Sequence, residues 1–176
     1  MVSIPTADLF TQAAASNATG LYEQPLSERM RTFLRLEFLY QQFCFNLEQT
    51  SEWGSRAAVA SMLDIVAILG RGDVRGDVLK ELERQIAVYD RYQNMAGIDE
   101  TRLKRVLRNL QDLRQRLFAV GPQFLQLIRD SEFLAAIKHR SAIPGGTCEF
   151  DLPAYSHWLS HAYEQRMADI EAWMKN

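Results

Sequence analysis

Between residues 28 and 47, large apolar side chains recur every three or four positions, which is the spacing of an α-helix. Ser27 precedes the run as a good N-cap, and Glu28 favours the positive end of the helix dipole. Phe38 and Phe45 fall outside the main apolar stripe, so the pattern predicts a helix that is buried on more than one side. We expect this helix to be the central element of the fold.

Helical spacing of apolar residues continues along most of the chain, interrupted by glycine and proline. The interruptions fall at Gly70, at Gly97, at the Gly121–Pro122 pair and before Pro153. Further helices are therefore predicted over 55–69, from Asp73 through Tyr89, between Asp99 and Gly121, over 122–129, over 131–140 and over 155–174.

Two short segments lack this spacing and are predicted to be strands. Residues 21–24 form a short extended segment before Pro25, and residues 147–152 alternate in polarity after the turn Ile143–Gly146. Residues 1–20 are small and polar, and we expect them to be a disordered extension. The predicted fold class for 21–176 is therefore all-α dominated: a helical bundle with one or two short β-strands.

Bulk composition excludes several classes of protein. The formal net charge of −2 gives no overall preference for nucleic acid or for an anionic membrane. Cys44 and Cys148 lie far apart, which fits a reducing compartment. Neither a signal peptide nor an apolar run long enough to span a bilayer is visible, so the sequence predicts a cytoplasmic protein without membrane contact.

A catalytic or metal-binding set is not evident. His157 and His161 lie four positions apart, as metal ligands on one helix do, and His139 precedes them. Only Cys148 and Asp151 lie near them in sequence, so surface or partly buried histidines are the favoured interpretation. We expect no metal, no cofactor and no enzymatic activity.

The most basic stretch has two interpretations. This stretch contains six cations and, against them, the carboxylate of Asp112. The cations are Arg102, Lys104, Arg105, Arg108, Arg114 and Arg116. The first interpretation is the solvated face of an amphipathic helix. The second is a patch for an acidic partner or nucleic acid, although no aromatic residues alternate with the charges as they do in single-strand binders.

Three arginines stand out for their surroundings. Arg35 lies on the apolar first helix, where its charge must reach either solvent or another subunit. Arg71 and Arg75 flank a glycine-rich loop before the helix capped by Asp73. Guanidinium groups beside a helix N-terminus suit a carboxylate-bearing peptide, and ordinary loop solvation is the alternative.

Three stretches together resemble the ZapD family of cell-division proteins. They are YEQPLSERMRTFLRLEFL at 22–39, RGDVR at 71–75 followed by LKEL at 79–82, and SAIPGGTCEFDLP at 141–153 followed by Trp158 and Leu159. They occur in the family's order and at nearly its spacing, and the resemblance covers about 21–173.

The resemblance implies a division-ring regulator that is not an enzyme. Members of this family bind the C-terminal tail of the tubulin-like protein FtsZ, and as homodimers they bundle FtsZ filaments at mid-cell. They have a helical domain, which supplies the dimer interface, and a small β-domain. The family's pattern continues beyond Trp173 with most of that β-domain, so we expect the β-domain to be largely absent here. A member of this family is not expected to have a nucleic-acid partner. The alternative function is that of a nucleic-acid-associated helical protein that uses the basic stretch 102–116.

The resemblance also assigns roles to individual residues. Arg71 matches a family arginine that is implicated in binding the tail, and Arg75 is its neighbour in the same motif. Arg35 matches a family arginine that is implicated in dimerisation. A family histidine at the dimer interface falls at Ser156 here, so the adjacent His157 is the candidate for that contact.

Overall fold

The computed structural model describes residues 22–93, 95–120 and 125–174. These residues form helices joined by turns and loops, which confirms the predicted helix-dominated fold class. The eight helices of the described residues are α1 (Glu28–Leu47), α2 (Glu52–Leu69), α3 (Val74–Tyr92), α4 (Glu100–Ala119), α5 (Gln126–Asp130), α6 (Glu132–Ser141), α7 (Pro153–Leu159) and α8 (Tyr163–Met174). The expected extension, residues 1–20, lies outside the described residues, as does Pro122.

Side-chain caps begin most of the long helices. Ser27, Ser51, Asp73, Asp99 and Ser131 each accept a hydrogen bond from the backbone N–H three residues ahead. Each cap satisfies one of the N–H groups that the first helical turn leaves without a partner. The cap at Ser51 starts α2 three residues before the predicted position.

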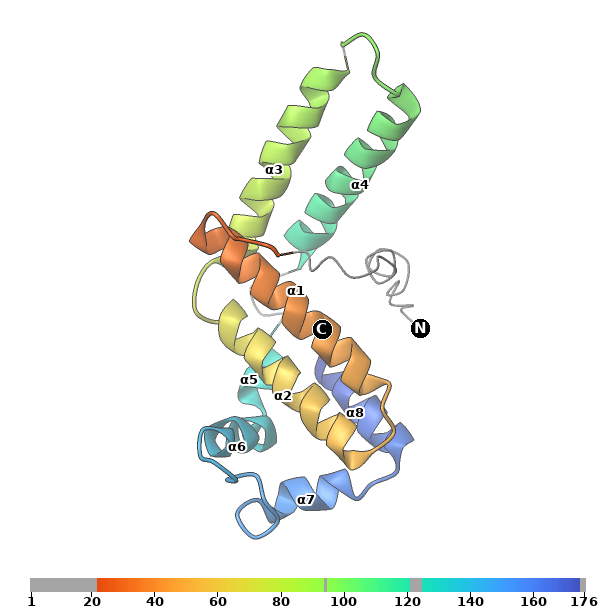
Figure 1. Cartoon of the computed structure of the whole chain (residues 1–176). Helices are drawn as coiled ribbons and strands as arrows, with labels where there is room; N and C mark the ends of the chain where they lie inside the picture. Colours follow the sequence, from red (N-terminus) through yellow and green to blue (C-terminus); the bar gives the residue numbers. More distant parts are fainter. Residues whose placement is uncertain (1–21, 94, 121–124, 175–176) are drawn as a thin grey trace.

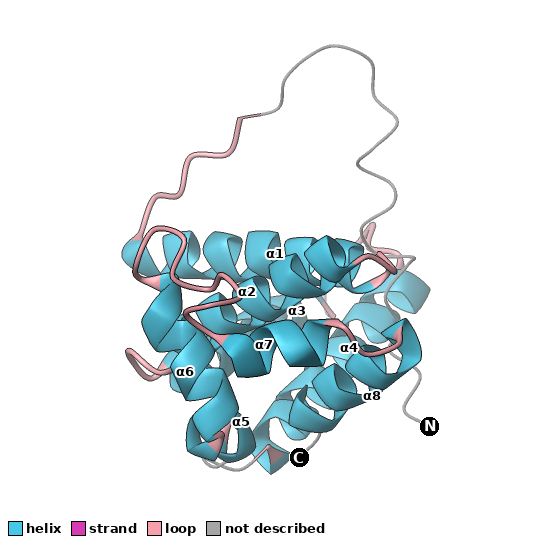
Figure 2. Cartoon of the chain, turned by 90° about the horizontal axis from the view of Figure 1, so that it is seen from below, coloured by secondary structure: helices cyan, strands magenta, loops and turns pink. Residues whose placement is uncertain are grey.

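The helices pack in layers around α2. In Figure 2, α1 lies along one side of the molecule, and α5 and α8 lie on the other. Helix α2 contacts α1, α6, α7 and α8. Figure 1 shows α3 and α4 as an antiparallel hairpin that extends away from the other helices. The molecule is thus a helical body with a protruding two-helix hairpin.

Helix α2, rather than α1, is the central element. Eight residues of α2 are buried, whereas Phe43 is the buried residue of α1. Phe38 and Phe45 are 64% and 66% exposed. The prediction of a central first helix was wrong because periodicity identifies an apolar face without showing which element covers it.

The body and the hairpin have separate apolar clusters. The hairpin cluster is small and consists of Ile86, Leu103 and Leu107, with Tyr89 and Leu110 packed against it. The larger body cluster comprises Phe43, Ala58, Val59, Met62, Leu63, Val66, Leu125, Ile128, Leu134, Ile137, Tyr155, Trp158, Leu159 and Ile170. Because the two clusters are separate among the described residues, polar contacts near the base of the hairpin gain importance.

The predicted strands are not present among the described residues. Residues 147–152 form consecutive turns, with Cys148 N–H donating to Gly145 O and Leu152 N–H donating to Cys148 O. Residues 22–24 also form no strand. A strand needs a neighbour to satisfy its backbone, and within the described part of the chain neither segment has one. The predicted turn is correct: Gly145 has a φ of +73°, and Gly146 N–H donates to Ile143 O.

The predicted helix over 155–174 is split into two. Helix α7 ends at Leu159, and α8 begins at Tyr163 after a short turn. The guanidinium of Arg166 on α8 donates hydrogen bonds to the carbonyl oxygens of Leu159 and His161. A continuous helix would use those carbonyls within its own backbone, so the side chain stabilises the break.

Candidate functional site

The loop between α2 and α3 presents Arg71 to solvent. Helix α2 ends with Gly70 N–H donating to Val66 O, and Arg71 N–H donates to Ile68 O. Asp73 then starts α3 by accepting from Gly76 N–H at 2.9 Å. Both sides of the loop are therefore fixed by backbone hydrogen bonds, while the Arg71 side chain is exposed.

A cavity of about 240 Å³ lies between this loop and the N-terminal half of α1. It combines an apolar lining with three arginines and two aspartates. Its lining residues are Arg29, Thr32, Phe33 and Arg35 of α1, Ile68 of α2, Arg71, Gly72 and Asp73 of the loop, and Val74 and Asp77 of α3. We call this cavity the arginine pocket.

Two of the predicted site residues meet in the arginine pocket. Arg35 and Arg71, which are 36 positions apart in sequence, both line it. Both are exposed, and within the described part of the chain neither side chain forms a hydrogen bond or an ion pair. The structure thus presents two guanidinium groups without internal acceptors beside an apolar surface formed by Phe33, Ile68 and Val74.

Arg75 lies near this loop but is directed elsewhere. Its Nε donates to Leu117 O at 3.2 Å, and its Nη2 donates to Phe118 O at 2.9 Å. These carbonyls belong to the last turn of α4, where helices carry unsatisfied acceptors. Arg75 therefore connects the start of α3 to the end of α4, and it is not among the residues that line the arginine pocket.

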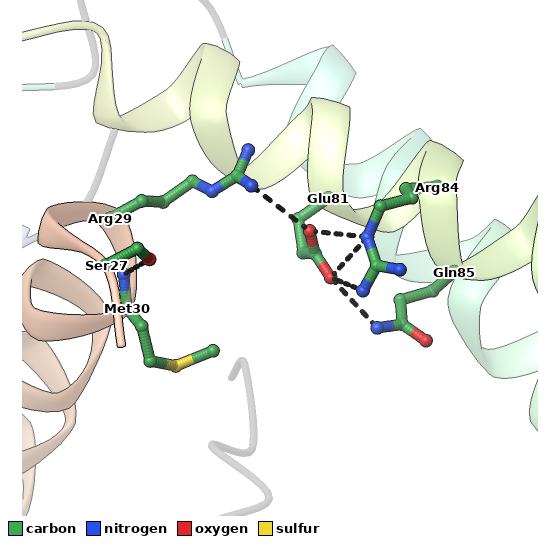
Figure 3. A network of polar contacts seen from close by, with 6 residues as sticks. All are labelled: Ser27, Arg29, Met30, Glu81, Arg84 and Gln85. Atoms are coloured by element: carbon green, nitrogen blue, oxygen red, sulfur yellow. Dashed lines mark hydrogen bonds and ion pairs between the residues drawn. The ribbon is translucent and has the colours of Figure 1, made fainter. Parts of the chain in front are cut away.

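Sequence reasoning missed Arg29 as a site residue. Its Nη2 lies 3.8 Å from Glu81 Oε2 on α3, and its side chain is 43% exposed. Figure 3 shows Arg29 reaching from α1 toward Glu81, which also contacts Arg84 and Gln85. Only the meeting of α1 and α3 in space reveals this arginine, because no local pattern distinguishes it from the other arginines of α1.

His157 lies far from the arginine pocket. It is an exposed residue of α7, and Figure 1 shows this helix at the end of the molecule opposite the α3–α4 hairpin. Its ring centroid lies 5.0 Å from that of His161, whose Nδ1 is buried without a hydrogen-bond partner among the described residues. The assignment of His157 to a dimer interface stays a prediction. No group of three or more potential metal ligands occurs in the residues that the structure describes.

The basic stretch of α4 lies on the outside of the hairpin. Arg116 pairs with Asp112 at 2.8 Å, and Lys104 pairs with Glu100 at 3.0 Å. Four further exposed cations have no ion pair within the described residues, namely Arg102, Arg105, Arg108 and Arg114. This is the pattern of a solvated helix face with a moderate positive excess.

Comparison with known proteins gives a consistent family assignment. Residues 34–176 match the family model described as "ZapD: Cell division protein". A protein named "Cell division protein ZapD" from Ralstonia nicotianae is 42% identical over 153 residues, which cover 87% of this chain and 61% of the relative. Proteins of the same name from Janthinobacterium sp. and Aromatoleum aromaticum are 39% and 36% identical, again over about three fifths of their lengths.

None of the described helices combines the length and the apolar character that a transmembrane span requires.

Proposed function

Because this chain belongs to the ZapD family of cell division proteins, we propose that it binds the C-terminal tail of FtsZ through the arginine pocket. As a homodimer it crosslinks FtsZ filaments and so stabilises the division ring. The chain spans about three fifths of the length of the curated relatives that it matches. Tail binding, dimerisation and crosslinking are therefore parts of the proposal, whereas a role in cell division follows from the family.

The observation that carries the proposal is the meeting of Arg29, Arg35 and Arg71 around one cavity. A flexible acidic peptide presents carboxylates, and a guanidinium binds a carboxylate through two parallel hydrogen bonds. Phe33 and Ile68 supply apolar surface beside those charges, which suits a peptide that mixes acidic and apolar side chains. Arg71 is the main candidate because its exposed side chain makes no ion pair within the described residues and because it matches the family arginine that is implicated in tail binding.

The outer face of α1 supports the dimer part of the proposal. Phe38 and Phe45 are exposed on the same helix as Arg35, seven positions apart and therefore on one side of it. Large aromatic side chains and arginine are typical of the buried centres of protein interfaces. A dimer formed through α1 would carry two arginine pockets, and two weak sites on one rigid body give strong crosslinks.

The proposed role is that of an adaptor in the cytoplasm at the mid-cell division site. It needs neither a cofactor nor a catalytic group, because holding two filaments together requires only binding. A fluorescent fusion should form a band at mid-cell, and a diffuse signal in dividing cells that contain an FtsZ ring would contradict the assigned location.

Peptide binding tests the proposal directly. Arg71→Gln should weaken binding of a labelled FtsZ tail peptide by about tenfold in fluorescence anisotropy, since one charge-assisted contact is lost. Arg91→Gln, at the far end of the exposed side of α3, is the matched control and should bind as the unaltered chain does. A full-length relative, such as the Ralstonia nicotianae protein, is measured in parallel. Equal affinity of the Arg71 and Arg91 variants would refute the site.

A second candidate function uses the basic face of α4. The observation in its favour is that Arg102, Arg105, Arg108 and Arg114 of the protruding hairpin form no ion pair among the described residues. It predicts binding of duplex DNA that weakens steeply with added salt. A gel-shift assay at low salt with no retarded band removes this candidate without affecting the first.

A further inference from the structure

Arg29 is shared between the arginine pocket and the α3–α4 hairpin. It lines the pocket from α1, and its guanidinium also pairs with Glu81 on α3 at 3.8 Å (Figure 3). Among the described residues, this is the ion pair that joins α1 to the hairpin. The contact therefore lies between the candidate peptide site and the element that protrudes from the body.

Glu81 does not depend on Arg29 for a counter-charge. Arg84 Nε donates to both carboxylate oxygens of Glu81, at 3.1 and 3.0 Å, and Gln85 Nε2 donates at 2.9 Å. These hydrogen bonds lower the pKa of Glu81 to about 2, and those from Arg84 have a larger effect than that from Gln85. The Arg29 contact is longer than all of them, so Arg29 can leave without stranding an unpaired carboxylate.

The carboxylates of α3 follow the edge of the pocket. Asp77 lines the pocket itself, and Glu81 follows one helical turn later on the same face of α3. The free protein thus holds acidic groups of its own beside the arginines that an acidic peptide would use.

We propose that Arg29 is a third peptide-binding arginine of the pocket and that Glu81 competes with the incoming peptide carboxylate for it. This inference rests on the proposed function, because it assumes that an acidic peptide enters the arginine pocket. Binding exchanges the Arg29–Glu81 pair for an Arg29–peptide pair and so releases the hairpin from α1. Glu81 thereby sets the affinity of the site without touching the peptide.

A double-mutant cycle with the labelled FtsZ tail peptide tests the competition. Glu81→Gln should tighten binding by about fivefold, the size of a partly exposed ion pair, and Arg29→Gln should weaken it by a similar factor. In the Arg29→Gln background the gain from Glu81→Gln should disappear, because Glu81 acts through Arg29. Circular dichroism of each variant establishes that the helices are retained.

The matched control separates competition from general electrostatics. Glu83→Gln removes the same charge two positions away on α3, at an exposed residue without an ion pair among the described residues. It should leave peptide affinity within about twofold of the unaltered chain, as expected for a screened surface charge. Equal gains from the Glu81 and Glu83 variants would overturn the inference, as would a Glu81→Gln gain that survives without Arg29.

The two proposals fail in distinguishable ways. If the unaltered chain binds the peptide, Arg71→Gln weakens it and Glu81→Gln has no effect, then the competition is refuted and the site stands. If neither the unaltered chain nor Glu81→Gln binds the peptide, both the proposed function and the competition are refuted.

Discussion

The Arg166 guanidinium donates from Nε to the Ser55 hydroxyl at 2.9 Å, and both residues are buried. The same guanidinium donates to Thr50 O at 2.7 Å and to Leu159 O at 2.8 Å. A charge in the interior is thus surrounded by oxygen acceptors from the segment before α2, the first turn of α2 and the end of α7. This single side chain connects α8 to the start of α2 and to the end of α7.

Removal of the Arg166 guanidinium should destabilise the whole body of the protein. Arg166→Met leaves the buried or partly buried carbonyl groups of Thr50, Leu159 and His161 without this donor, and we expect the free energy of unfolding to fall by about 3 kcal/mol. Urea denaturation followed by circular dichroism measures the change. Lys138→Met on the exposed side of α6 is the control and should change stability by less than about 0.5 kcal/mol. A loss of similar size in both variants would show that the buried network contributes little.

The substitutions Arg75→Gln and Arg71→Gln should have different effects on peptide binding. Arg75→Gln removes two hydrogen bonds to the last turn of α4, so amide hydrogen exchange should become faster at the end of that helix. FtsZ-tail affinity should change by less than about twofold, because the Arg75 guanidinium is already engaged within the molecule. If Arg75→Gln weakens peptide binding as strongly as Arg71→Gln does, the assignment made from the sequence motif is the correct one.

The exposed aromatic residues of α1 give a test of dimerisation. Changing both Phe38 and Phe45 to glutamate should convert a dimer into a monomer in light scattering, because charges would enter the apolar centre of the interface. Phe150→Glu is the matched control, since Phe150 is 86% exposed in the turns before α7. Peptide affinity per subunit should not change in either protein. A double variant that remains dimeric would remove this face of α1 from the interface.

The role of Arg35 is decided by measuring both peptide affinity and molecular mass in solution. It lines the arginine pocket, and the resemblance assigns it to the dimer interface. If Arg35→Gln weakens peptide binding by about fivefold and leaves the mass unchanged, its role is in the pocket. A change to monomer with unaltered peptide affinity would support the dimer role.

Local patterns predicted those parts of the fold that local chemistry determines. Ser27 and Asp73 were predicted as helix caps because a capping side chain and the following apolar run lie next to each other in sequence. The turn at Gly145 was predicted for the same reason, since a positive φ favours glycine.

Features that depend on distant residues could not be predicted in this way. The break after Leu159 depends on Arg166, seven positions later, in a segment whose periodicity is continuous. The exposure of Phe38 depends on which helix covers α1. In the candidate site, Arg71 was identified from its loop and motif, whereas Arg29 gained significance only from its position opposite Glu81.

The low pKa of Glu81 predicts how its ion pairs respond to acid. Its folded-state pKa of about 2 lies below the ordinary value of 4.5, chiefly because Arg84 and Gln85 donate to the carboxylate. A depressed pKa stabilises the folded state fully above the ordinary value, and the stabilisation is lost as the pH falls from about 4.5 to about 2. The Arg29–Glu81 pair should therefore be intact at neutral pH.

Comparison of the unaltered chain with Glu81→Gln isolates this contribution. The difference in free energy of unfolding between the two proteins should be constant from pH 7 to pH 5 and should shrink below about pH 4.5. The carboxyl carbon of Glu81, followed by NMR, should titrate with a midpoint near 2. Glu83→Gln provides the control for the loss of one negative charge from α3. A Glu81 midpoint near 4.5 would show that neither Arg84 nor Arg29 holds the carboxylate, and the competition for Arg29 would then lose its basis.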